Sequence, residues 1–235
     1  MREPGFQETL RADGGVGDLT RRVTQPSVST RTRVPDSRSP FVEGSIDEVD
    51  AARAQEYALV SAVLARAPDR GLLQRISELR GDAGPLGLAH IALAEAAAST
   101  PIEQVEREFF DLFIGLGRGE LLPYGSYYLT GFLHERPLAR LRDDLVALGI
   151  ERVDGGTEPD DHAAIVCEIM AGLIAQRLGA PAGSDEEFFK KHLAPWVGRF
   201  FADLERAKAP NFYRQVGTLG RVFIQIEMEA FALPA

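Results

Sequence analysis

Beyond residue 45, apolar side chains recur at intervals of three and four along almost the whole chain. In residues 46–67 the repeat runs through Val49, Tyr57, Val60 and Leu64, which is the spacing of one face of an α-helix. Similar stretches follow at 69–80, 86–98, 102–114, 137–148, 159–178, 188–204 and 212–226. No segment shows a convincing alternation of apolar and polar residues between hairpin turns. The pattern therefore predicts an all-α fold.

Capping residues and glycines divide this pattern into separate helices. Thr100 followed by Pro101 and Glu103 is typical of a capping box with proline at the first helical position. Ser184 and Glu187 indicate a second box. Glycines close three of the helices, at Gly81, Gly149 and Gly179. The 86–98 segment is rich in Ala and Leu almost all round, so we expect it to be a buried central helix.

The first 44 residues differ in composition from the rest. They contain four Pro, five Gly, and seven Arg against six acids. Such a segment cannot bury enough surface to offset its ordering entropy, so we predict a disordered tail at 1–44 and a single helical domain at 45–235. The motif Thr20-Arg21-Arg22-Val23 partly matches a twin-arginine export signal, but no apolar segment follows it. We therefore interpret the segment as a solvated tail, or as the product of a start site assigned too far upstream, and expect a cytoplasmic protein.

Charge and composition exclude several classes of protein. The net charge is −9, with 26 Lys and Arg against 35 Asp and Glu. A general nucleic-acid binder is disfavoured, because phosphates require a basic face. A single Cys excludes an internal disulfide framework and a Cys-rich metal site built by this chain alone. The longest apolar stretch is too short for a membrane helix, so we expect no membrane insertion.

A glycine-rich segment, Gly115-Leu116-Gly117-Arg118-Gly119, is the first candidate for chemistry. A phosphate cradle needs glycines ahead of a helix and usually a Lys that reaches the phosphates. Here the glycines follow a predicted helix, and no Gly-Lys-Ser/Thr sequence occurs. The segment is more typical of a helix terminator, and a nucleotide site at Gly115 and Gly117 is the alternative.

The histidines and the cysteine give no catalytic constellation. No two of the histidines have metal-binding spacing; they are His90, His134, His162 and His192. Glu158 and His162 are four residues apart, but such a pair is more often a helix-start ion pair than a ligand set. Cys167 lies beside Glu168 on an apolar helix, where a thiolate is disfavoured, so we interpret it as a packing residue. We therefore do not expect hydrolytic activity.

Residues 143–161 carry seven carboxylates against the single Arg152. Runs of like charge are usually solvated. Three of the acids lie at the predicted start of a helix near Pro159, where the helix dipole favours negative charge: Glu158, Asp160 and Asp161. The remaining excess surrounds Gly155-Gly156, which we interpret as a hinge at about 149–160 between two packed halves. An acidic hinge beside apolar helices suits a basic, hydrophobic peptide.

Two motifs make the chain similar to a known family. Phe110-Asp111-Leu112-Phe113-Ile114-Gly115-Leu116-Gly117, followed by Leu122-Pro123-Tyr124-Gly125-Ser126-Tyr127-Tyr128-Leu129, resembles the signature of the TorD/DmsD family. Glu158-Pro159-Asp160-Asp161-His162 resembles the E-P-x-D-H motif of that family at the inter-helix hinge. The resemblance runs from about residue 46 to the end of the sequence.

The resemblance implies a function. Members of the TorD/DmsD family are cytoplasmic, all-helical chaperones for molybdenum-containing oxidoreductases and are not enzymes. They bind the catalytic subunit, often through its twin-arginine signal peptide, and hold it back from export while the molybdopterin cofactor is inserted. Some form homodimers by exchanging helices across the hinge. Which molybdoenzyme this chain serves does not follow from the sequence.

We expect a set of aromatic and hinge residues to hold the signal peptide. Its apolar segment would lie on aromatic side chains, and its arginines would pair with carboxylates. The candidate residues are Phe113, Tyr124, Ser126, Tyr127, Tyr128, Glu158, Pro159, Asp160, Asp161 and His162. For the loop residues an equally open interpretation is structural, a segment that packs the two halves together.

The chain departs from the family pattern at three positions. Leu116 and Leu122 stand where Pro is common, and Gly125 stands where a Glu often precedes the Ser. The missing carboxylate at 125 removes one partner for the client's arginines. Two further functions stay open: transient binding of a guanine nucleotide or the molybdopterin cofactor near Gly115 and Gly117, and a metal at Glu158 and His162. We expect no permanently bound cofactor and no metal.

Overall fold

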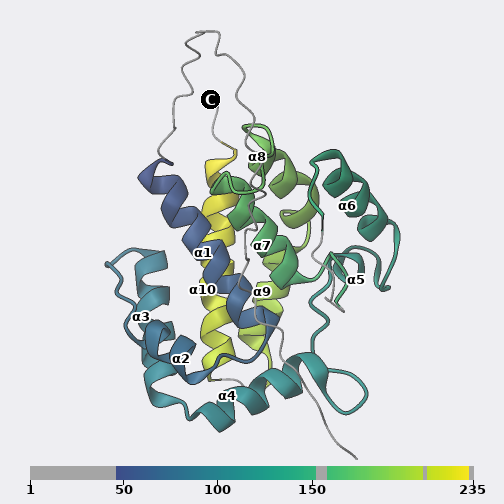
Figure 1. The fold of residues 1–235 in the computed structure, drawn as a ribbon. Coiled ribbons are helices and arrows are strands. Elements are labelled where there is room, and N and C mark those ends of the chain that lie inside the picture. The colour runs from purple at the N-terminus through teal and green to yellow at the C-terminus, as the bar shows by residue number, and fades with distance from the viewer. Residues whose placement is uncertain (1–45, 152–157, 209–210, 233–235) are drawn as a thin grey trace, which may run out of the picture. The chain divides into compact units, whose positions relative to one another are not determined.

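The computed structural model describes residues 46–151, 158–208 and 211–232, all within the compact unit Gly44–Ala235 (Figure 1). The predicted disordered tail at 1–44 lies outside the described residues. So does the centre of the predicted hinge, with Asp154 and Gly155-Gly156.

The described residues form ten α-helices and two short π-helical segments without a strand, which confirms the all-α prediction. The α-helices are α1 (Glu48–Ala65), α2 (Arg70–Ser77), α3 (Pro85–Ser99), α4 (Ile102–Phe109), α5 (Gly125–Thr130), α6 (Arg136–Ala147), α7 (Ala163–Ile174), α8 (Ser184–Phe188), α9 (Val197–Arg206) and α10 (Phe212–Ala230). The π-helical segments η1 (Phe110–Ile114) and η2 (Phe189–Leu193) directly continue α4 and α8. No helix in the described ranges is both long enough and apolar enough to span a bilayer.

Helix α7 is the buried centre of the fold. Ten of its twelve residues are buried, because its sequence is apolar at every position except the exposed Glu168. It packs along α1, and α10 packs against α9 and α3, so helices from the beginning and the end of the described chain pack side by side (Figure 1). The prediction that 86–98 forms the central helix is wrong. Helix α3 packs on α2 and α10 with its small Ala side chains and leaves Leu88 55% exposed.

Helix α7 begins later than its sequence suggests. His162 is the N-cap and Ala163 the first helical residue, so the prediction of a helix start near Pro159 is wrong. The carbonyl oxygen of Pro159 instead accepts a hydrogen bond from the backbone N–H of His162 (3.0 Å), which closes a turn. The acids predicted for the first turn therefore precede the helix: Glu158, Asp160 and Asp161. The helix ends at Ile174, before the predicted stop at Gly179.

Both predicted capping boxes are wrong. The hydroxyl of Thr100 is buried and accepts a hydrogen bond from Nδ2 of Asn211 (3.0 Å), so it links the starts of α4 and α10. Ser184 lies inside α8 and donates to the carbonyl oxygen of Pro181 (2.7 Å), while Gly183 is the N-cap. In each case the hydroxyl makes a hydrogen bond with a distant residue or within a turn. It does not make the capping hydrogen bond that the local spacing predicted.

A buried carboxylate joins α4 to α10. Glu108 is 5% exposed and accepts hydrogen bonds from the backbone N–H groups of Asn211, Phe212 and Tyr213 at 2.9, 3.0 and 3.2 Å. These N–H groups open the helix and have no partner within it, and the helix dipole favours an anion at this end. The start of α10 is therefore positioned by a residue of a distant helix.

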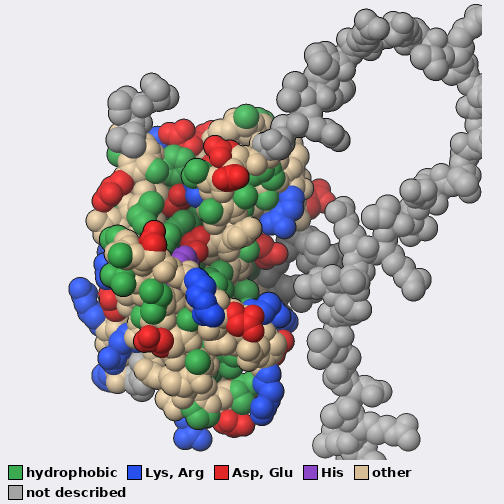
Figure 2. All heavy atoms as spheres, turned by 90° about the vertical axis from the view of Figure 1, so that its left-hand side faces the viewer, with side chains coloured by type: hydrophobic (Ala, Val, Ile, Leu, Met, Phe, Trp, Pro, Cys, Tyr) green, Lys and Arg blue, Asp and Glu red, His purple; other side chains and the backbone are tan. Residues whose placement is uncertain are grey.

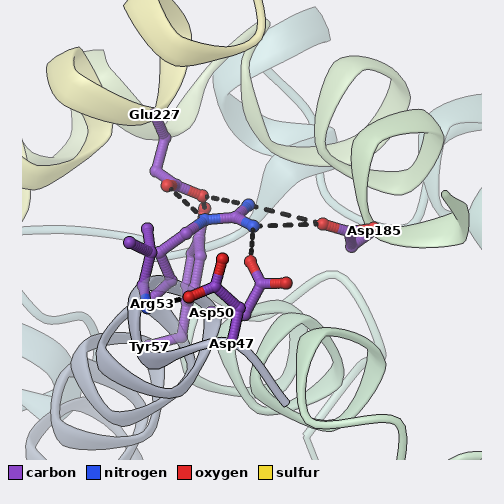
Figure 3. Close-up of polar contacts among 7 residues, drawn as sticks. Asp47, Asp50, Arg53, Tyr57, Asp185 and Glu227 are labelled. Atoms are coloured by element: carbon purple, nitrogen blue, oxygen red, sulfur yellow. Dashed lines mark hydrogen bonds and ion pairs between the residues drawn. The ribbon is translucent and has the colours of Figure 1, made fainter. Parts of the chain in front are cut away.

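A second charged cluster ties α1 to α10 and α8 (Figure 3). Arg53 donates to both oxygens of the buried Glu227 at 2.8 and 2.9 Å, and the hydroxyl of Tyr57 donates to the same carboxylate at 3.1 Å. Asp50 lies 2.8 Å and Asp185 lies 3.4 Å from the guanidinium. Burial alone would lower the pKa of Arg53, but the hydrogen bonds and charge of Glu227 outweigh it and raise that pKa. One permanently charged guanidinium thus connects three helices.

The face formed by α1, α2 and α3 has a mixed surface (Figure 2). Acidic and basic side chains are interspersed on it, and apolar side chains form small groups. The clefts described below lie elsewhere, beside α6.

The charged cluster predicts a stability effect. Glu227→Ala should lower the free energy of unfolding by about 3–5 kcal/mol, because it leaves Arg53 partly buried without its main partner. Urea denaturation followed by circular dichroism measures the change. The matched control is Glu229→Ala, an exposed carboxylate on the same helix, which should change the free energy by less than about 0.5 kcal/mol. Equal effects of the two substitutions would contradict the role assigned to the cluster.

Candidate functional site

Two loops meet at the site, one before α5 and one before α7. Tyr124 and His162 form an isolated antiparallel backbone bridge. On either side of it, Gly125 N–H donates to the carbonyl oxygen of Asp161 (2.9 Å) and Ala163 N–H donates to that of Pro123 (2.7 Å). Both motifs singled out in the sequence are therefore held together by main-chain hydrogen bonds.

His162 has two structural roles in this pairing. Besides forming the bridge, its Nδ1 accepts a hydrogen bond from the backbone N–H of Ala164 (3.1 Å) and so caps α7. This contact requires Nδ1 without a proton, which places the proton of the neutral ring on Nε2. Burial lowers the pKa of His162 below its ordinary 6.5, against the opposing charges of Glu158 and Asp161. The ring is therefore neutral at physiological pH.

Tyr124 packs against the capping histidine. The two rings are 5.2 Å apart between centroids, edge to face, and the Tyr124 hydroxyl donates to Oε2 of Glu158 at 2.5 Å. Burial, followed by the hydrogen bond and charge of Glu158, raises the pKa of Tyr124. The hydroxyl thus keeps its proton and fixes the position of the Glu158 carboxylate.

Asp161 is the most constrained carboxylate of the site. It is 3% exposed, and its Oδ2 accepts a hydrogen bond from the backbone N–H of Ser126 (2.7 Å). Its other oxygen, Oδ1, is buried without a hydrogen-bond partner among the described residues, as is the hydroxyl oxygen of Ser126. A buried carboxylate oxygen without a donor is costly.

Asp161 lines a cleft of about 440 Å³ between α6 and the segment from η2 to α9. The cleft combines apolar walls with charged groups of both signs. Its lining residues are Gly125, Leu129, Pro137, Arg140, Leu141, Asp143, Asp144, Asp161, Lys191, His192 and Trp196. Volumes of a few hundred cubic ångströms are typical of ligand sites in proteins.

The remaining predicted aromatic residues do not line the cleft, although Tyr128 packs against Trp196 of its wall, 5.8 Å away between ring centroids. Phe113 packs against Phe109 and Tyr213, 5.2 and 5.6 Å away between ring centroids. Tyr127 accepts a hydrogen bond from Arg118 (3.1 Å), and Tyr128 donates to Asp203 of α9 (3.0 Å). The predicted residues that lie together at the loop pairing are Tyr124, Ser126, Glu158, Asp161 and His162.

The rest of the acidic segment divides between the hinge and the cleft. Asp160 is paired with Arg142 of α6 (2.6 Å). Asp143 and Asp144 line the cleft, and Asp144 accepts a hydrogen bond from Nε2 of His192 (2.8 Å). Burial raises the pKa of Asp144, but the hydrogen bond of His192 and the charge of Lys191 outweigh it and hold that pKa below its usual range.

The glycine segment is a helix terminator, as predicted. Gly115 caps η1 with φ +61°, and a Cβ there would lie 2.2 Å from the carbonyl oxygen of Arg118. Neither Gly115 nor Gly117 lines the cleft beside Asp161. Nucleotide or pterin binding at these glycines stays a prediction.

Cys167 is fully buried in α7, and burial raises the pKa of its thiol to about 12, which confirms its packing role. Within the described ranges, no cluster of three or more His, Cys, Asp and Glu side chains has the geometry to hold a metal ion.

Sequence reasoning missed much of the cleft wall. Arg140 and Asp143 belong to a helix that looked like an ordinary amphipathic one, and Trp196 and His192 come from a distant part of the chain. Gly125 was the one residue in the local sequence that could have indicated a close contact at this wall. A Cβ there would lie 3.0 Å from Nε1 of Trp196, so a glycine allows the loop to approach the indole.

A solved structure of another protein shares this fold. The crystal structure of a protein from Archaeoglobus fulgidus, assigned as a redox enzyme maturation protein, has the same fold with a TM-score of 0.51 and 19% identity. The likeness covers 82% of this chain and 99% of that one. By its fold, this chain therefore belongs to the same all-helical class as that protein.

Sequence relatives identify the family. The profile of the nitrate reductase delta subunit family matches residues 80–202, more than half of the chain. Chaperone protein TorD of Vibrio cholerae is 28% identical over 131 residues, 52% of this chain and 60% of that protein. Chaperone protein TorD of Actinobacillus succinogenes is 26% identical over 172 residues, 73% of this chain and 81% of that protein. The chain belongs to the nitrate reductase delta subunit family, which includes the TorD chaperones, and the predicted TorD/DmsD resemblance is confirmed. The match spans 60% of the length of the Vibrio cholerae relative.

The buried histidine predicts a pH effect on stability. The unfolded chain takes up a proton on His162 near pH 6.5, whereas the folded chain does so only at lower pH. The stability contributed by the neutral ring is therefore full above pH 6.5 and is lost as the pH falls through the folded-state pKa. His162→Asn retains a capping oxygen but does not titrate. The free energy of unfolding of this variant should fall less between pH 7.5 and 5.5 than that of the unsubstituted protein.

The matched control is the exposed His134, which has a left-handed φ of 61° that Asn tolerates. His134→Asn should leave the pH dependence unchanged in urea titrations. If His162→Asn retains the full pH dependence, the neutral capping role is wrong.

Proposed function

We propose that this chain is a cytoplasmic chaperone, without catalytic activity, for the catalytic subunit of a molybdenum-containing oxidoreductase. It would bind the twin-arginine leader of that subunit and hold the subunit while the molybdenum cofactor is inserted. Membership of the nitrate reductase delta subunit family and the similarity to TorD chaperones support this proposal. The observation that carries it is Asp161, a buried carboxylate that lines the cleft and has one oxygen without a hydrogen-bond partner among the described residues.

The chemistry of the cleft fits an arginine side chain. Asp161 Oδ1 needs a hydrogen-bond donor, and a guanidinium offers five N–H groups in a planar fork. Leu141 and Trp196 provide apolar walls for the methylene stem, and Asp143 adds a second carboxylate. A charged donor on an apolar stem therefore satisfies both the polar and the apolar part of the lining.

The neighbouring residues position Asp161. The bridge of Tyr124 and His162 fixes the backbone next to the aspartate, and Ser126 N–H holds one of its carboxylate oxygens. Glu158 is exposed and accepts the hydrogen bond of Tyr124 at the loop pairing, where it would meet a second arginine of the leader. This division of roles agrees with a peptide that carries two adjacent arginines.

Asp161→Asn tests the proposal. The Asn oxygen can still accept from Ser126, so the fold should persist, but the negative charge that attracts a guanidinium is lost. We expect a synthetic twin-arginine leader peptide to bind the variant at least tenfold more weakly, which corresponds to about 1.4 kcal/mol or more. Titration calorimetry at low salt measures the affinity, which should also fall as salt is added.

Two controls complete this test. Glu95→Gln removes one negative charge from an exposed position of α3 that does not line the cleft and should leave the affinity unchanged. A leader with both arginines replaced by lysine should bind the unsubstituted protein more weakly, because lysine lacks the planar fork. Unchanged affinity of Asp161→Asn for the arginine peptide would refute the role of Asp161.

A further inference from the structure

The cleft beside Asp161 is lined by charged side chains of both signs. They are Arg140, Asp143, Asp144, Asp161 and Lys191. These charges differ in the partners that they have within the protein. That difference separates the charges that the fold already compensates from those that it does not.

Asp144 and Lys191 compensate each other. Nζ of Lys191 lies 3.6 Å from Oδ2 of Asp144 and 2.7 Å from Oε1 of Glu187, and Asp144 also accepts a hydrogen bond from Nε2 of His192 at 2.8 Å. The same four residues line a smaller cleft of about 120 Å³. Their charges are therefore satisfied by contacts within the protein.

Arg140 and Asp143 are not compensated in this way. Both side chains are exposed and line the larger cleft, and neither makes a hydrogen bond or an ion pair with another described residue. They are three residues apart on α6, so they occupy neighbouring positions on one helix face. With the basic residue nearer the N-terminus, such a pair contributes less to helix stability than the reverse order. Stabilisation of α6 therefore does not explain these two charges.

Helix α6 holds both charged residues at fixed backbone positions. The helix is anchored in the core by three buried leucines, Leu138, Leu141 and Leu145. Leu141 also lines the cleft, so the charged positions and part of the apolar wall belong to one packed helix. Arg140 and Asp143 are about 4.5 Å apart along its axis. A ligand in the cleft would therefore meet opposite charges at a defined separation.

The cleft thus presents one cation and two carboxylates that have no ion-pair partner among the described residues. Asp161 has an oxygen without a hydrogen-bond partner in this part of the chain, Asp143 is the second carboxylate, and Arg140 is the cation. A leader whose only charges are arginines would satisfy the carboxylates but would place like charge near Arg140, which is unfavourable. A segment that carries charges of both signs would satisfy all three residues.

We propose that Arg140 is a specificity-determining residue, which pairs with an acidic side chain of the client leader close to the arginine held by Asp161. This inference rests on the proposed function. A guanidinium recognises a carboxylate through two parallel N–H···O hydrogen bonds. In an extended segment, side chains two residues apart point the same way and are about 6.6 Å apart, close to one helical turn of about 5.4 Å on α6. The acid should therefore lie two residues from the arginine pair.

Two sets of synthetic leader peptides test the proposal. Within each set the peptides share the arginine pair and differ only in one residue, which is Glu, Gln or Lys. This residue lies two positions before the pair in the first set and two positions after it in the second. We expect the full-length protein to bind the Glu peptide of one set about fivefold more tightly than its Gln peptide, the upper range for a partly exposed ion pair. Titration calorimetry at low salt measures the affinities, and added salt should reduce the preference.

Variants of Arg140 show whether this residue recognises the acid. Arg140→Gln should abolish the preference for Glu, because the positive charge is lost. Arg140→Glu should reverse it, so that the Lys peptide binds more tightly than the Glu peptide. A damaged fold would weaken all the peptides and could not produce this reversal. The matched control is Arg136→Gln, at an exposed position of the same helix that does not line the cleft, which should leave the preference unchanged.

The outcomes distinguish this inference from the proposed function. Equal binding of the Glu, Gln and Lys peptides in both sets would overturn the role of Arg140 and leave the proposed function intact. A preference for Glu that persists in Arg140→Gln would also overturn it, because another group would then recognise the acid. If Asp161→Asn binds every peptide normally while the preference follows Arg140, the inference stands and the role of Asp161 fails. If no peptide binds, both proposals fail.

Discussion

The main-chain pairing of Tyr124 with His162 is the constraint on which the site depends. It brings together two loops that would each leave polar backbone groups unsatisfied if buried alone, and the reciprocal hydrogen bonds of Gly125 and Ala163 satisfy them. His162 also caps α7, the most buried helix. The same few atoms therefore fix the start of the central helix and the position of Asp161, so the cleft is built on the rigid part of the fold.

The carboxylate of Asp161 shows that this position is not optimised for stability alone. Replacement of a buried charged group by a well-packed apolar one is often neutral or stabilising, and Asp161 has one oxygen without a donor. Glu108 provides the contrast within the same fold, since it is almost as buried but accepts three backbone hydrogen bonds. One carboxylate completes a helix end, whereas the other has an oxygen without a donor among the described residues.

Periodicity predicted the helices well because each of them buries one stripe against the rest, and the motif of Glu158 to His162 pointed to the loop pairing. The start of α7 could not be predicted, because a histidine cap and a partner loop, rather than the acids and Pro159, determine it. The cleft could not be predicted from the sequence either. Arg140 and Trp196 meet there only after α6 folds against η2, and no local spacing encodes that approach.

Gly125, one of the departures from the family pattern, lies at a close contact in the structure. A side chain at Gly125 would begin 3.0 Å from the indole nitrogen of Trp196, whose N–H donates to the carbonyl oxygen of His192. A Cβ here would be in unusually tight contact with the indole, so glycine eases the close approach of the loop to Trp196. Asp143 and Asp144 place negative charge in the same cleft that Gly125 lines. Because these acids belong to α6, the charge of this cleft depends on the position of that helix, and a shift of α6 would change its width and its electrostatics together.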